Sequence, residues 1–103
     1  MRMLLKASMP VEKANAVIKD GGFPRNMESI LGDLKPEAAY FYAEDGRRTA
    51  LIVFDLKDPS QIPAVAEPFF LALNASVELH PVMNAEDLKK GLAGAQQAVK
   101  KYG

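Results

Sequence analysis

The chain has 103 residues, 49% of them apolar and 25% charged, which is the balance of an ordinary globular domain with one modest core. Its 13 basic and 13 acidic side chains cancel, and this argues against a nucleic-acid binder, because such proteins carry a basic excess on one face. Cysteine is absent, so disulfides, thiolate metal sites and cysteine nucleophiles are excluded.

Neither a targeting segment nor a membrane span is expected. The apolar run at the start, MRMLLKASMP, is too short for a signal peptide and is interrupted by Lys6. No other run approaches the roughly 20 apolar residues of a membrane helix. We therefore expect a cytoplasmic protein with a single domain over residues 1–103.

The first third of the chain predicts one strand and helical structure. Residues 2–8, RMLLKAS, alternate in the manner of a strand. Pro10 suits the first turn of a helix, whose spacing continues to Ile18. The stretch DGGFP at 20–24 interrupts this helix, and helical spacing resumes over 27–34. We expect one broken helix or two helices in sequence.

A hairpin of two strands is the clearest prediction. Residues 38–43, AAYFYA, read as a strand, and EDG is the signal of a tight turn. The returning strand, RTALIVFD at 48–55, is apolar almost throughout, which is typical of a strand buried on both faces.

The last part of the chain predicts helix, strand and helix. Residues 58–74 form a helix in which Asp58 and Gln61 have the spacing of a capping pair, and Asn74 suits its left-handed end. Residues 76–82, SVELHPV, form a strand. A final helix begins after Asn84 and carries one narrow apolar stripe, formed by Leu88, Leu92, Ala95, Val99 and Tyr102.

This order predicts an α+β fold: a ferredoxin-like β-α-β-β-α-β unit with a four-stranded antiparallel sheet, plus a C-terminal helix. The topology places the first and third strands in the centre. The most apolar strand, 48–55, then lies in the centre, and Pro81, which cannot donate to a neighbour, lies in an edge strand.

The two faces of this sheet differ in polarity. One face is apolar and is expected beneath the crossover helices; it collects Met3, Leu5, Ala7, Ala39, Phe41, Ala50, Ile52, Phe54, Val77 and Leu79. The other face is mixed; it collects Leu4, Lys6, Tyr40, Tyr42, Thr49, Leu51, Val53, Asp55, Glu78, His80 and Val82. The mixed face is too apolar to remain in water, and no spare helix covers it. We therefore expect a homodimer.

A ferredoxin-like unit of this length that pairs sheet to sheet resembles the dimeric α+β barrel superfamily. The stretches ILGDLKPEAAYF, DPSQIPAVAEPFFLALNASVELHPVM and EDLKKGL are similar to a group of small bacterial members that have no assigned function. The similarity covers nearly the whole chain and implies the fold. It does not select a reaction, because the superfamily includes cofactor-free monooxygenases, isomerases, haem enzymes, ligand sensors and stress proteins.

Two branches of that superfamily fit this chain poorly. The haem branches need a longer chain and a placed axial histidine. Several cofactor-free monooxygenases use a tryptophan in the pocket, and this chain has none. The missing tryptophan weighs against an oxygenase without removing that alternative, and the departure from the haem branches leaves no cofactor expected.

Glu78 and His80 are the candidate catalytic residues. They are two apart on a strand and so point to one face, where a carboxylate beside an imidazole can act in proton transfer. The pattern favours the alternative of a solvated polar strand end. One histidine and one carboxylate are half a set of metal ligands, so no metal site is assigned, although a dimer axis would bring a second pair.

Four residues of the mixed face are candidate ligand-binding residues. Tyr40 and Tyr42 can line an aromatic pocket or pack in an interface. Lys6 is either a buried, perturbed amine or reaches the rim of the sheet. Asp55 ends the central strand and can orient His80 or a ligand, or form a turn.

Two functional classes follow. The first is a dimeric module that binds a small organic ligand or another protein, with a pocket on the mixed face or between sheet and helices. The alternative is a cofactor-independent enzyme, monooxygenase- or isomerase-like, acting on a small organic substrate. We favour the module because no catalytic constellation is complete. The expected partners are a second copy and a small ligand, without nucleic acid or membrane.

Overall fold

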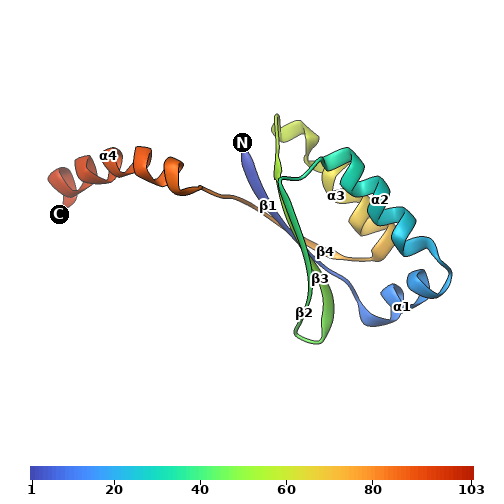
Figure 1. Cartoon of the computed structure of the whole chain (residues 1–103). Helices are drawn as coiled ribbons and strands as arrows, with labels where there is room; N and C mark the ends of the chain where they lie inside the picture. The colour runs from blue at the N-terminus through green and yellow to red at the C-terminus, as the bar shows by residue number, and fades with distance from the viewer.

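The computed structural model describes all 103 residues as an α+β fold, a sheet with helices on one side and a last helix standing apart (Figure 1). The strands are β1 (Arg2–Ser8), β2 (Ala38–Glu44), β3 (Arg47–Asp55) and β4 (Ser76–Pro81). The helices are α1 (Val11–Lys19), α2 (Gly22–Leu34), α3 (Ile62–Leu73), preceded by the short helix η1 (Pro59–Gln61), and α4 (Ala85–Tyr102). None of these helices combines the length and the apolar character needed to cross a bilayer.

The four strands lie in the order β2-β3-β1-β4, and every neighbouring pair is antiparallel. The first and third strands are therefore central, as the sequence predicted. Pro81 pairs with Met3 at the end of the edge strand β4, where a missing backbone donor is tolerated. This arrangement is compatible with a ferredoxin-like fold.

The connection between β1 and β2 departs from the plain β-α-β-β-α-β pattern, because it holds two helices. Gly21 has φ of +82°, a left-handed conformation that prevents α1 from continuing. The Asp20 carboxylate then accepts a hydrogen bond of 2.8 Å from the Gly22 backbone amide. The stretch DGGFP thus separates two helices, but its last three residues form the first turn of α2 rather than a loop.

The capping signals at the other helix ends are confirmed. Asp58 and Gln61 form a reciprocal capping box at η1, which starts the helical run into α3. Asn74 ends α3 in the left-handed conformation, with φ of 48°. Asn84 and Asp87 form a second capping box at the start of α4.

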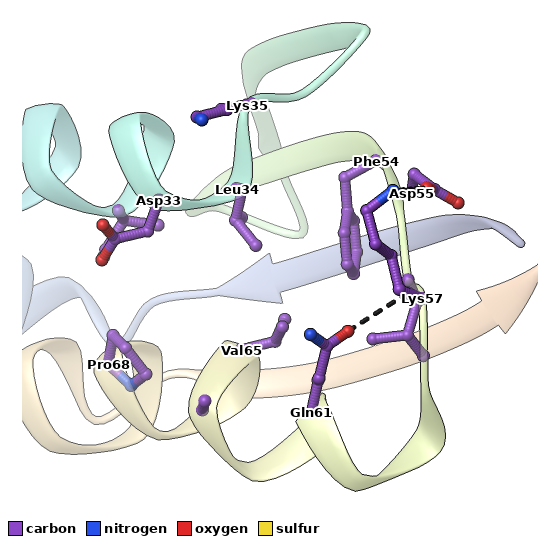
Figure 2. Close-up of a pocket in the computed structure, with 12 residues that line it drawn as sticks. Asp33, Leu34, Lys35, Phe54, Asp55, Lys57, Gln61, Val65 and Pro68 are labelled. Atoms are coloured by element: carbon purple, nitrogen blue, oxygen red, sulfur yellow. Dashed lines mark hydrogen bonds and ion pairs between the residues drawn. The ribbon is translucent and has the colours of Figure 1, made fainter.

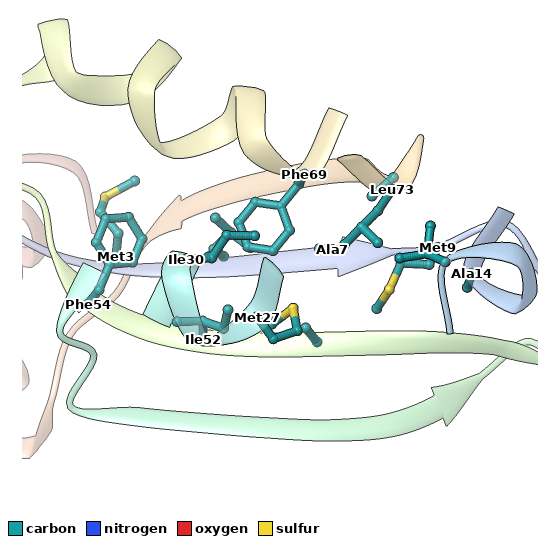
Figure 3. Packing of buried hydrophobic residues seen from close by; sticks show 14 of the residues in the cluster. Met3, Ala7, Met9, Ala14, Met27, Ile30, Ile52, Phe54, Phe69 and Leu73 are labelled. Atoms are coloured by element: carbon teal, nitrogen blue, oxygen red, sulfur yellow. The ribbon is translucent and has the colours of Figure 1, made fainter. Parts of the chain in front are cut away.

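The core lies between the sheet and the three covering helices (Figure 3). The central strands contribute Leu5 and Ile52, and α3 contributes Phe69, all with no exposed surface. The predicted apolar face is thus confirmed in its centre. Phe41 is the exception: its side chain is 51% exposed because β2 is an edge strand, and the helices do not extend over it.

Helix α4 buries none of its residues, although Asp87 in its first turn accepts a hydrogen bond from Arg2 of β1. Figure 1 shows it extending from the end of β4, on the other side of the sheet from α1–α3. The chain is therefore elongated, with extents of 59 × 28 × 20 Å and a radius of gyration of 17.1 Å. A compact domain of this length has a radius of gyration of about 13 Å.

The packing of α3 gives a test with a built-in control. We expect Leu73→Ala to lower the free energy of unfolding by about 2–5 kcal/mol, because it opens a cavity in the core. Leu71→Ala, two residues away, removes a side chain that is 75% exposed and should change stability by less than about 0.5 kcal/mol. Urea denaturation at one protein concentration measures both values. Equal losses would contradict the orientation of α3.

Candidate functional site

The sheet face turned away from α1–α3 is uncovered; we call it the open face. Along β1 and most of β3 its side chains alternate with those of the core, as the sequence predicted, whereas Thr49, expected on this face, is buried. Leu4, Leu51 and Val53 are half-buried by their neighbours, whereas Tyr40 is 63% exposed. An apolar centre without cover is the main unexplained surface of the sheet.

Strand register places four of the predicted site residues in two neighbouring rows of the open face, while Tyr42, opposite Thr49, lies in a third row. Glu78 lies opposite Lys6, which lies opposite Leu51, which lies opposite Tyr40. In the next row, His80 lies opposite Leu4. The two candidate catalytic residues thus share a face with Lys6.

Five side chains form a connected series that we call the polar chain: His80, Glu78, Lys6, Glu44 and Tyr42. The His80 Nε2 atom lies 4.0 Å from Glu78 Oε1, and Lys6 Nζ lies 4.0 Å from Glu78 Oε2. Lys6 also forms an ion pair with Glu44. The Tyr42 hydroxyl donates to Glu44 Oε1 over 3.0 Å. The structure thus brings four of the six predicted site residues together.

Sequence reasoning missed Glu44, the member of the polar chain that joins Lys6 to Tyr42. Its signal was present: Glu44 stands two residues after Tyr42 at the end of the same strand and so shares its face. The turn EDG had been read only as a hairpin signal. The contact with Lys6 spans two strand boundaries and depends on the path of a long side chain, which local sequence does not show.

Ion pairing fixes the charges within the polar chain. The hydrogen bond to Glu44 raises the pKa of Lys6, and the same contact lowers the pKa of Glu44. Partial burial, followed by the bond to Glu44, raises the pKa of Tyr42. At neutral pH the series therefore holds a charged lysine, a charged glutamate and a neutral tyrosine. Such a lysine is a salt-bridge partner and not an activated nucleophile.

Asp55 is held by groups other than His80. Its Oδ1 atom accepts from the N-terminal amine of Met1 over 2.6 Å, and its Oδ2 atom accepts from Lys57 Nζ over 3.0 Å. These two cations lower the pKa of Asp55 to about 2, the amine contributing most. In the sheet register Asp55 lies opposite Arg2, at the end of the strands. The structure therefore does not unite Asp55 with His80.

A cavity of about 600 Å³ lies between α2, α3 and the end of β3. Figure 2 shows Leu34, Phe54 and Val65 facing one another across it. Charged side chains stand at its rim: Asp33, Lys35, Asp55 and Lys57. Its volume and apolar floor are those of a small-molecule site. The sequence had left the gap between sheet and helices open as a site, but of the cavity residues it singled out only Asp55.

Neither metal ligation nor similarity adds a further assignment. No three His, Asp or Glu side chains gather in a way that would hold a metal ion. The chain matches no protein-family model and no curated protein. What the protein does must therefore be argued from the open face and the cavity.

The pairing of Asp55 predicts an acid-sensitive contribution to stability. Its pKa is lowered from 3.8 to about 2, so the folded state holds the proton less tightly than the unfolded chain. The contribution is complete above the higher value and is lost as pH falls through the lower one. We expect Asp55→Asn to weaken the pH dependence of the unfolding midpoint between pH 3.8 and pH 2.

The control is Glu67→Gln, which removes an exposed carboxylate from α3. Unfolding is followed by circular dichroism on protein with an unblocked Met1. A profile for Asp55→Asn that stays as steep as that of Glu67→Gln would contradict the pairing of Asp55 with the N-terminal amine.

Proposed function

We propose that the protein is a homodimeric module of the dimeric α+β barrel type that binds a small organic ligand. The open face is the observation that carries the proposal, because its apolar centre is uncovered by any helix of the chain. A second copy of the same face is the simplest cover, and two-fold pairs are the commonest assemblies. The strand order, with β1 and β3 central, supports the comparison with that superfamily.

Burial of the open face is favourable in physical terms. Each aliphatic side chain removed from water contributes about 1.5–3 kcal/mol. Leu4 lies opposite Val53 in the register, and Leu51 follows two residues along β3 on the same face. Charges in such an interface are costly unless paired. The polar chain already pairs Lys6 with Glu44, so this face can be covered without leaving that lysine alone.

The cavity between α2 and α3 supports ligand binding within each copy. Its floor is apolar, and the amine of Lys35 at its rim belongs to no ion pair. Lys57 stands nearby and is shared with Asp55. This combination suits a compact, largely apolar acid: the apolar part would fill the floor, and the carboxylate would lie near Lys35.

The second candidate is a cofactor-independent enzyme on the open face. One observation favours it: His80, Glu78 and Lys6 stand in line, so an imidazole is beside a carboxylate and an amine. His80 is exposed in the single chain, and a partner would be needed to exclude water there. The ligand-binding module needs fewer such conditions and is therefore placed first.

The dimer is tested by charge on the open face. We expect the natural chain to sediment as a dimer at micromolar concentration, and Leu51→Glu and Tyr40→Glu to shift it toward single chains. Tyr40 is well exposed, so its replacement does not disturb the core. Leu71→Glu, which places the same charge on the outer side of α3, should leave the dimer intact.

Circular dichroism verifies that each variant is folded before sedimentation is interpreted. A natural chain that sediments only as single molecules would remove the dimer from the proposal. The same holds if Leu71→Glu dissociates the protein as readily as Tyr40→Glu.

The ligand site is tested by methyl NMR with a set of small apolar carboxylic acids. We expect binders to shift the methyl signals of Ile30, Leu34 and Val65, which line the cavity. Val65→Trp fills the cavity and should abolish the shifts, whereas Leu71→Trp should not. Shifts confined to the methyl signals of Leu4, Leu51 and Val53 would instead place the ligand on the open face and favour the enzyme.

A further inference from the structure

We propose that α4 is an exchanged arm, whose apolar stripe packs on the body of a second copy of this chain. The proposal rests on the homodimer proposed above and adds to it a separate contact. The body is here defined as residues 1–84, and the arm as α4. Five observations lead to this assignment.

The stripe predicted on α4 is present and uncovered. Leu88 and Leu92 are each 51% exposed, Val99 is 68% exposed and Tyr102 is 78% exposed. No residue of α4 is buried. Large side chains that recur along one face of a helix are the pattern of a helix that packs on another surface.

The helix is poorly suited to stand alone in water. It contains Gly91 and Gly94, each of which disfavours a helix interior by about 1 kcal/mol relative to alanine. Most of the stability of protein helices comes from packing of an apolar face and not from propensity. Since α4 buries none of its apolar stripe against its own chain, the stabilising surface must come from elsewhere.

The root of the arm is fixed to the body. Arg2 donates from Nε to Glu37 Oε1 over 2.6 Å and from Nη1 to Asp87 Oδ2 over 3.3 Å. The Val82 amide donates to the Arg2 carbonyl over 3.1 Å. These contacts orient α4 away from the helix layer, on the side of the open face (Figure 1). A copy seated on the open face would therefore lie alongside the arm.

The exposed area supports a second copy as the occupant. The single chain exposes 7078 Å², whereas a compact chain of 11.2 kDa exposes about 5,700 Å². The excess of about 1,400 Å² exceeds the roughly 800 Å² that each partner buries in a standard interface. The excess is therefore large enough for one standard contact with a second copy, to which α4 contributes uncovered apolar surface.

Charge supports the same occupant. The arm has four lysines, Lys89, Lys90, Lys100 and Lys101, against two acidic residues. The rest of the chain has nine basic and eleven acidic side chains. The zero net charge thus divides into a basic arm and an acidic body. Arm and body of two copies attract each other, as complementary surfaces do.

The first test disrupts the stripe in the full-length chain. We expect L88E/L92E to raise the dissociation constant of the dimer by about 100-fold or more, since two leucines lose their apolar contact. The matched control is A93E/Q97E, which adds the same two charges at the same spacing on the opposite face of α4. The control should change the constant less than tenfold. Sedimentation or fluorescence dilution measures both.

The second test asks whose body the arm contacts. The chain has no cysteine, so K90C carries a single nitroxide label on the polar side of α4. Labelled, isotope-free chains are mixed with ¹⁵N chains that carry no label. We expect broadening of amide signals from the ¹⁵N body, because only a partner's arm can cause it. Reduction of the nitroxide with ascorbate should restore the signals.

The outcomes separate the arm from the sheet pairing. A dimer unaffected by L88E/L92E, or mixed dimers without broadening of body signals, overturns the exchanged arm and leaves the open-face dimer in place. A dimer that survives Tyr40→Glu and Leu51→Glu but is lost with L88E/L92E overturns the sheet pairing and supports the arm. A natural chain that remains single overturns both.

Discussion

The structure depends on an imbalance between its sheet and its helices. The central strands β1 and β3 are apolar on the core face and also carry Leu4, Leu51 and Val53 on the open face, but α1, α2 and α3 cover only the core face. Helix α4, which could have covered part of the open face, projects away from the sheet. A chain of this size thus buries one face in its own core and leaves the reverse face uncovered, as a surface that associates would be.

The polar side chains of the open face are compatible with the association proposed for it. Lys6 lies on a central strand, where an unpaired ammonium would oppose burial by its desolvation. Its ion pair with Glu44 and the bond from Tyr42 to the same carboxylate satisfy these groups within one chain. Because Lys6 is already paired with Glu44, it is a poor candidate for a reacting group. His80 and Glu78, at the exposed edge, are the groups that a ligand could reach.

Local patterns were sufficient for the strands, the caps and the central position of β1 and β3. Alternation and turn chemistry act over a few residues. The stretch SVELHPV was therefore enough to predict a strand, and the spacing of Asp58 and Gln61 was enough to predict a helix cap. The partner of Asp55 could not be predicted from local sequence, because the N-terminal amine lies 54 residues away in the chain. The cavity was equally hidden, since α2, α3 and β3 meet there only through tertiary packing.

The N-terminal residues connect the two regions for which a function has been proposed, the cavity and α4. Met1 binds Asp55 at the rim of the cavity, and its carbonyl accepts from the Leu56 amide over 2.8 Å. The next residue, Arg2, fixes the root of α4 through Asp87. Cavity rim and arm root are therefore adjacent parts of one hydrogen-bonded strand end. Because coupling between two sites is reciprocal, a ligand that reorders the rim and a partner that holds the arm would affect each other's affinity through this same short segment.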